Sequence, residues 1–185
     1  MDGAGAELVV AKRLDGQRAE RRPFLGEHRR DLALGGAVDA GVGPAGQDNL
    51  HIAREIFAAW NAHDVEGFVK RLDAKTRWES DVFPAPFSGH EGARQFFKVY
   101  LTAFPDLHLD IEQILAAGDS HVVVRWRSRG THLGPLGDIP ATGRKASNRG
   151  CTVMEIKNAK AAHAWVYFDN AHLPRQIGVL PGSEG

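Results

Sequence analysis

The spacing of apolar residues changes at Pro105, and this change limits the folds open to the chain. Before Pro105 apolar residues recur every three or four positions, as on one face of an α-helix; after it they recur every second position, as along a β-strand. Leu107, Leu109 and Ile111 alternate with polar residues. Proline also ends a helix, because it lacks an N–H and clashes with the preceding turn. The sequence therefore predicts helices first and a sheet afterwards, an α+β fold.

Three helices are predicted before the change. The first begins behind a cap at Asp48 or Asn49 and the second behind Asp64, since short polar side chains accept the free N–H groups of a helix start. The third opens at Ser88 and Glu91, which have the spacing of a capping box. The apolar stripes are Ala53, Ile56, Phe57 and Trp60; Val65, Phe68, Val69 and Leu72; and Ala93, Phe96, Phe97, Tyr100, Leu101 and Phe104.

One strand is predicted before Pro105 and four after it. Residues 74–83 read as a short strand that enters a proline-containing loop. Residues 107–112 and 121–133 can pair across a turn at Gly118, and residues 146–157 and 160–168 across a turn at Asn158. A short helix over 170–177 ends before Gly178. Helices on one face of a curved antiparallel sheet leave a concavity, which is where such a fold would hold a ligand.

The N-terminal segment differs in composition from the rest. Residues 1–46 contain nine glycines, seven basic and seven acidic residues, and one aromatic residue, Phe24. Such a segment has little to bury and is predicted to be disordered, unless it reflects a start codon placed too early. The predicted division is a tail of residues 1–46, a folded domain of residues 47–178 and a C-terminal tail of residues 179–185. Deletion of the N-terminal tail is expected to leave folding intact.

Charge and cysteine content exclude several classes of protein. Basic and acidic residues number 23 each, so no net field attracts nucleic acid or an anionic membrane. No apolar run approaches the roughly 20 residues of a membrane span, and no signal-peptide core is present. The single Cys151 cannot form an intramolecular disulfide, which predicts a reducing compartment, the cytoplasm. The nine histidines show no metal-binding spacing, so no metal site is predicted.

Several segments carry a family resemblance. They are "REIFAAWNAHDVEGF", "GHEGARQFFKVYLTAFPDLHLDIEQILAAGDSHVVVRWRSRGTHLGPLGDIPATGRK" and "YFDNAHLPRQIG". In this order they resemble the SnoaL-like polyketide cyclase, or ester cyclase, family of the nuclear transport factor 2-like superfamily. The resemblance spans about residues 49–178, and it rests on the ordered set of segments more than on any single short motif.

The resemblance implies a cone-shaped domain, in which a curved, mostly antiparallel sheet carries three N-terminal helices on its concave face around an apolar pocket. It also implies no organic cofactor or metal, and a homodimer formed through the outer face of the sheet. The family's polyketide cyclases close a ring by an intramolecular aldol reaction, in which an aspartate on the last long strand takes and returns a proton. In this chain Val166 holds that position, and a valine cannot transfer a proton.

Two residues remain as catalytic candidates. Asp169 follows the last strand and either acts as acid or base or caps the closing helix, accepting the N–H groups of Ala171 or His172. His132 lies in a glycine-rich loop that resembles the family's pocket rim, and the alternative is a loop histidine that bonds the backbone.

Seven residues are candidates for contact with a ligand. Most are aromatic residues, which the pattern also allows as plain core. Thr152 shares its strand face with Asn148, at a place where the polyketide cyclases carry a polar residue. The Tyr100 hydroxyl needs a polar partner if buried, and a ligand carbonyl would serve. The set is Trp60, Trp78, Phe96, Tyr100, Phe104, Thr152 and Val166.

The opposite strand face is predicted to differ. Arg125, Arg127 and Arg129 alternate along one strand and indicate a solvated or dimer-facing surface rather than an anion site. Cys151 and His163 are expected on this side as well, because period two places them opposite Thr152 and Val166.

Two functions stay open. The first is a cofactor-independent cyclase, isomerase or hydrolase acting on a hydrophobic, carbonyl-bearing small molecule, with Asp169 or His132 as the acid or base. The second is a binding or interaction module of the same fold that has lost its proton shuttle. Val166 favours the second, and the intact pocket framework favours the first.

Overall fold

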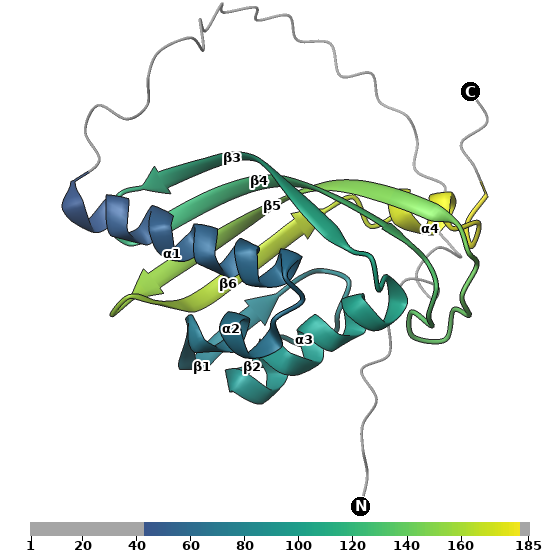
Figure 1. The fold of residues 1–185 in the computed structure, drawn as a ribbon, viewed down its shortest axis with the longest axis horizontal. Coiled ribbons are helices and arrows are strands. Elements are labelled where there is room, and N and C mark those ends of the chain that lie inside the picture. The colour runs from purple at the N-terminus through teal and green to yellow at the C-terminus, as the bar shows by residue number, and fades with distance from the viewer. Residues whose placement is uncertain (1–42, 182–185) are drawn as a thin grey trace, which may run out of the picture.

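The computed structural model describes residues 43–181 (Figure 1). The predicted disordered tail, residues 1–46, lies outside the described residues as far as residue 42, and residues 44–46 belong to the first helix instead. The helices are α1 (Pro44–Asn61), α2 (Val65–Lys70), α3 (Gly89–Ala103) and α4 (His172–Gln176). The strands are β1 (Leu72–Glu79), β2 (Phe87–Ser88), β3 (His108–Ala117), β4 (His121–Thr131), β5 (Lys145–Lys157) and β6 (Lys160–Phe168). The predicted α+β class and the order of the elements are confirmed.

The strands form one sheet in the order β2-β1-β6-β5-β4-β3. All neighbours are antiparallel except β1 and β6, which run parallel. Gly118 turns the β3–β4 hairpin with φ +67°, and Asn158 and Ala159 turn the β5–β6 hairpin with φ of 50° and 57°. Two consecutive residues with positive φ give a turn whose twist matches that of the strands it joins. Both hairpins predicted from these turns are therefore present.

The first three helices cover one face of the curved sheet (Figure 1). We call this side the inner face and the opposite side the outer face. The core lies between the helices and the inner face, and its largest fully buried side chains include Phe68, Ile56, Leu72 and Met154. Burial of such side chains provides the main driving force for folding and holds the two layers together.

The first helix begins earlier than the sequence predicts. It starts at Pro44, not behind Asp48 or Asn49, because the fixed φ of proline suits the first helical position. Asn49 is instead buried, and its Nδ2 donates to the carbonyl oxygen of Asp119 at 2.9 Å, which ties α1 to the β3–β4 turn. The folded domain therefore begins before the predicted residue 47.

The other two predicted caps have different outcomes. The cap at Asp64 is confirmed, since its Oδ1 accepts the N–H of Gly67 at 2.9 Å. The capping box is wrong: among the described residues, the Ser88 side chain makes no capping hydrogen bond. Ser88 belongs to β2, where it pairs with Arg77 and exposes its side chain.

Two further boundaries shift. Leu72, predicted on a helical stripe, begins β1 because α2 ends at Lys70. A bulge in β3 between Ile111 and Gln113 moves the later residues of that strand by one position. Ile111 precedes the bulge on this edge strand and is partly exposed, so the predicted apolar alternation is not fully buried.

The closing helix extends the sheet beyond the end of β6. The Gln176 side chain accepts the N–H of Ser147 at 2.9 Å and donates to the Ser147 carbonyl oxygen at 2.6 Å. These are the bonds that a neighbouring strand would make. The N–H groups of Val179 and Leu180 still bond the Pro174 carbonyl, so ordered contacts continue past the predicted boundary at residue 178.

Candidate functional site

A cavity of about 90 Å³ lies between the helices and the inner face of the sheet. Helices α1 and α3 form one wall, strand β1 adds to it, and strands β4 to β6 form the other. The seven residues predicted to contact a ligand all lie around this cavity: Trp60, Trp78, Phe96, Tyr100, Phe104, Thr152 and Val166. The helical and strand periods brought them together, because each points its side chain to the buried side of its element.

The helical wall of the cavity is an interlocked aromatic cluster. Phe96 sits at its centre, with its ring centroid 5.8 Å from Trp60, 5.5 Å from Trp78 and 5.2 Å from Tyr100. The Trp60 ring also stacks on Phe97 at 4.3 Å. Edge-to-face and stacked rings at these distances attract one another beyond their burial. The wall is thus held by its own packing.

The sheet wall carries a short polar strip. Thr152 pairs across the strands with Val166, and its Oγ1 accepts a hydrogen bond from Trp126 Nε1 at 2.9 Å. Asn148 lies on the same face, where its Nδ2 donates to the Asp169 carbonyl at 3.0 Å and its Oδ1 accepts the N–H of Arg149 at 2.9 Å. The amide of Asn148 is therefore occupied, whereas the Thr152 hydroxyl keeps its own proton for another acceptor.

Two further polar side chains line the cavity. Among the described residues, the buried Trp78 Nε1 has no hydrogen-bond partner, and the half-buried Tyr100 lines the same cavity with its phenol. Burial raises the pKa of Tyr100 well above its ordinary value, so the hydroxyl stays protonated at neutral pH. An indole N–H can only donate. The groups available to a ligand are thus hydrogen-bond donors.

The two catalytic candidates lie away from the cavity. Asp169 is exposed, and its Oδ1 accepts the N–H groups of Ala171 at 2.9 Å and His172 at 3.0 Å. These bonds hold the pKa of Asp169 below its ordinary value, so the carboxylate stays ionised and engaged as a cap. The Asp169 side chain therefore bonds the start of α4, although the N-cap residue of this helix is Ala171, and no geometric observation supports a role as acid or base in the cavity.

His132 is fully buried but faces a different cluster. Its ring packs on Phe104 with centroids 5.2 Å apart, and its Nδ1 lies 3.1 Å from the Thr142 hydroxyl. Burial lowers the pKa of His132, which keeps the imidazole neutral at pH 7. Around the cavity itself, the described residues include no carboxylate and no imidazole.

Trp126 and Gly150 are the site residues that sequence reasoning missed. They are cross-strand partners, and a Cβ at Gly150 would overlap the ring carbons of Trp126 and lie 2.7 Å from the Tyr167 carbonyl oxygen. The absence of a side chain at Gly150 therefore lets the indole lie against β5. A glycine inside a strand signals a close approach, but the approaching group emerges only from the strand register.

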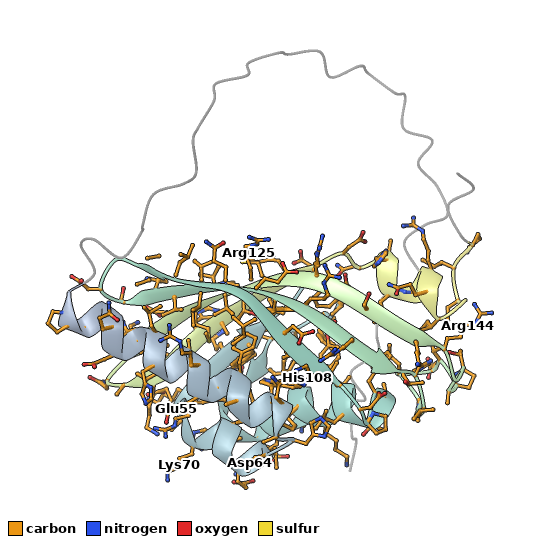
Figure 2. All side chains as sticks on the ribbon, turned by 45° about the horizontal axis from the view of Figure 1, so that its top comes forward. Glu55, Asp64, Lys70, His108, Arg125 and Arg144 are labelled. Carbon is orange, nitrogen blue, oxygen red and sulfur yellow. The ribbon has the colours of Figure 1, made fainter. Side chains whose placement is uncertain are left out.

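The outer face is rich in charge. Figure 2 shows Arg125 on the side of the sheet away from α1. The carboxylate of Glu112 lies within 3.4 Å of three guanidinium groups, those of Arg125, Arg127 and Arg149. The arginines are thus exposed and ion-paired on the outer face, where a solvated or dimer-facing surface was predicted. Burial raises the pKa of Cys151 on the same face, an effect that the nearby Arg125 opposes.

The outer face also carries a stacked pair of rings. The His163 ring stacks on Trp165 at 3.9 Å, and its Nε2 is 2.9 Å from Glu79 Oε1. His163 therefore faces away from Val166, as the strand period predicts. Within residues 43–181 no three side chains are arranged to hold a metal ion, and no described helix is long and apolar enough to cross a membrane.

Three helices over the inner face of a curved six-stranded sheet, closing on an apolar cavity, form a nuclear transport factor 2-like fold. Residues 51–177 match the family described as SnoaL-like polyketide cyclase. The chain belongs to this family.

Solved structures show the same fold. TsrD from Streptomyces laurentii is 27% identical with a TM-score of 0.65, over 72% of this chain and 97% of TsrD. A candidate SnoaL-like polyketide cyclase from Jannaschia sp. CCS1 is 20% identical with a TM-score of 0.69, over 75% and 97%. An NTF2-like protein from Burkholderia pseudomallei K96243 is 22% identical with a TM-score of 0.60, over 71% and 98%. Comparison with curated protein sequences found no match.

Proposed function

We propose that the chain binds an apolar small molecule that carries a hydrogen-bond acceptor, such as a carbonyl oxygen, in the cavity. One observation carries this proposal: in a mostly aromatic and aliphatic cavity, Tyr100, Trp78 and Thr152 each bring an O–H or N–H that can donate to a ligand. A buried donor without a partner costs free energy, and a ligand acceptor removes that cost. Few polar groups in an apolar pocket are typical of sites that orient a small ligand.

A cofactor-independent cyclase or isomerase is the second candidate, and family membership favours it. Tyr100, kept protonated by burial, would donate to the oxygen of a developing enolate and stabilise its charge. Abstraction of the proton from carbon also needs a base, and Val166 stands where the family carries its aspartate. Ligand binding without proton transfer by a side-chain carboxylate is therefore the function that we favour.

We propose further that two copies pair through the outer face. Val123, Val153 and Trp165 are half-buried at the centre of this face, where no helix covers them, and the arginine pairs surround them. An apolar centre with a charged rim is the usual composition of an interface. Analytical ultracentrifugation of wild type and Val153→Arg tests the pairing, which fails if both sediment as monomers.

Acetophenone, a one-ring ketone, is a suitable first probe for the binding proposal. We expect saturable binding in isothermal titration calorimetry, weakened about fivefold by Tyr100→Phe, because one hydrogen bond contributes about 1 kcal/mol. Tyr167→Phe is the matched control: it removes the same hydroxyl from the outer face, where Tyr167 is exposed, and leaves the affinity unchanged. An absence of binding, or equal weakening by both substitutions, would contradict the proposal.

A further inference from the structure

The cavity is small for a ligand-binding site. Its volume is about 90 Å³. Pockets for drug-sized ligands run from about 300 to 1,000 Å³, and an engineered cavity that binds benzene measures about 150 Å³. This space is smaller than the cavity that holds benzene, so even a ligand of one ring must extend through the partly open side of the cavity, and a framework of three fused rings exceeds the space much further. The cavity therefore selects by size as well as by polarity.

The Trp126 indole occupies space along the sheet wall. It extends from β4 across β5, where Gly150 leaves room for it, and its Nε1 is fastened to Thr152 Oγ1. Trp126 is nearly fully buried, so the indole is fixed on both sides. Any side chain at position 150 would displace it. The sequence thus uses a tryptophan and a glycine as a pair to fill the floor of the cavity.

The helical wall of the cavity is closely packed and cannot be enlarged in the same way. Trp60, Phe96 and Trp78 lock one another through ring contacts, and the core behind them is fully buried. Close-packed interiors resist the movement of such side chains. Two bulky groups on the sheet wall stand beside the polar strip, Trp126 and Phe168, and of these Trp126 bonds Thr152 directly. Removal of this indole is the change that would enlarge the cavity toward its polar groups.

We propose that Trp126 sets the upper size limit of the ligand, and that the cavity takes a one-ring carbonyl compound rather than a fused-ring polyketide. This inference rests on the proposed binding function. The ring lies against the aromatic wall, the carbonyl accepts from Tyr100 or Thr152, and the indole blocks further rings along β5. The class of ligand is therefore a compact, neutral, cyclic ketone or a related acceptor.

A size series of ketones tests this limit by calorimetry. The probes are acetophenone with one ring, 1-tetralone with two and 9-fluorenone with three. For wild type we expect acetophenone to bind at least about tenfold more tightly than fluorenone. In Trp126→Ala we expect this ratio to fall at least about tenfold, because fluorenone gains the indole's space. Trp126→Phe should also lower the ratio of acetophenone to fluorenone affinity. This variant replaces Trp126→Ala in the test if the alanine variant does not fold.

Trp165→Ala is the matched control. It makes the same truncation on the outer face, where the indole stacks on His163, and should leave the wild-type ratio unchanged. The inference is overturned if wild type binds fluorenone as tightly as acetophenone, or if neither Trp126 variant changes the ratio. If the size limit fails in this way but Tyr100→Phe still weakens acetophenone binding, the proposed binding function stands. An absence of binding to every ketone would instead contradict the proposed function itself.

Discussion

The two faces of the sheet are built from the same strands and carry opposite chemistry. On β5, Thr152 and Asn148 point inward and are buried, while Cys151 and Arg149 alternate with them on the outside. On the inner face the neutral Thr152 hydroxyl bonds the Trp126 indole. On the outer face the Arg149 guanidinium pairs with the carboxylate of Glu112. Strand alternation thus concentrates charge on one side. Arg129 is the one charged residue among the described residues around the cavity, and its guanidinium lies 3.3 Å from Asp110 Oδ1.

The largest difference should appear on truncation of an aromatic ring. Phe96→Ala removes a ring that is 4% exposed and should lower the free energy of unfolding by about 3–5 kcal/mol, through lost burial and a residual cavity. Tyr167→Ala on the outer face, where the residue is 50% exposed, should cost less than about 1 kcal/mol. Urea denaturation measures both. Equal losses would show that the inner face is not the packed side.

A carboxylate introduced at the family's catalytic position should break the neutrality of the inner face. In Val166→Asp the apolar surroundings raise the pKa of the new group above its unfolded value near 3.9. The folded state then binds more protons, so stability is highest near pH 4 and falls by about 1.4 kcal/mol per pH unit until the folded pKa is reached.

Tyr167→Asp is the outer-face counterpart of that variant. Its carboxylate is solvated, so its pKa stays close to the unfolded value and no comparable slope develops. Thermal denaturation from pH 4 to pH 8 compares the two variants. A flat profile for Val166→Asp would mean that the cavity hydrates an acid freely.

The cap at the end of β6 should show the reverse pH dependence. The pKa of Asp169 is lowered by the N–H groups of Ala171 and His172, so its stabilisation is present above the unfolded value near 3.9 and is lost as pH falls through the lowered folded pKa. Asp169→Ala should therefore reduce the melting temperature slightly at pH 7 and converge with wild type in acid. Asp169→Asn, which can still cap, should stay close to wild type throughout.

Acetophenone binding provides the control for the cap. The affinity should be the same in wild type and Asp169→Asn, since the carboxylate does not line the cavity. A weakened affinity in the asparagine variant at equal stability would return Asp169 to the site.

The smallest effect concerns the thiol of the outer face. Burial raises the pKa of Cys151, so less thiolate is present at pH 8 and iodoacetamide should modify it more slowly than free cysteine. Arg125→Gln should slow the reaction further, because the guanidinium favours the thiolate. Cys151 is the single cysteine of the chain, so mass spectrometry reads the rate directly. Modification as fast as that of free cysteine would show that this part of the face is open to solvent.

The sequence predicted most of the fold because the periods of its apolar residues are clear. The change at Pro105 separates helices from strands, and the turns at Gly118 and Asn158 define the hairpins. Helix starts were harder, since Asp48 and Asn49 look like caps but the proline four residues earlier begins the helix. The Ser88 box failed because a tertiary contact, strand pairing with Arg77, took precedence over local bonding.

The candidate site was likewise predicted where the apolar periodicity is clear and missed where tertiary contacts decide. Residues such as Phe96 and Val166 were placed at the cavity by periodicity alone, because a buried stripe faces the core. His132 was predicted at the rim, yet its loop folds back so that the ring packs on Phe104. The contact between Trp126 and Gly150 could not be predicted, because it depends on the register between β4 and β5. A loop of residues 132–144 joins these two strands, so no tight turn fixes their register from the local sequence.

The parallel pairing of β1 with β6 also bears on the order of folding. Lys160 bonds the carbonyl of Lys70, 90 residues away, at the start of this pairing. Contacts so distant in sequence form late, because the entropy of closing a long loop must be overcome first. The β3–β6 meander has two tight turns and one loop, residues 132–144, all far shorter than this separation, and can form early. We therefore expect the strand that carries Trp78 to dock last, so that the cavity closes in the final step and an early ligand could accelerate its closure.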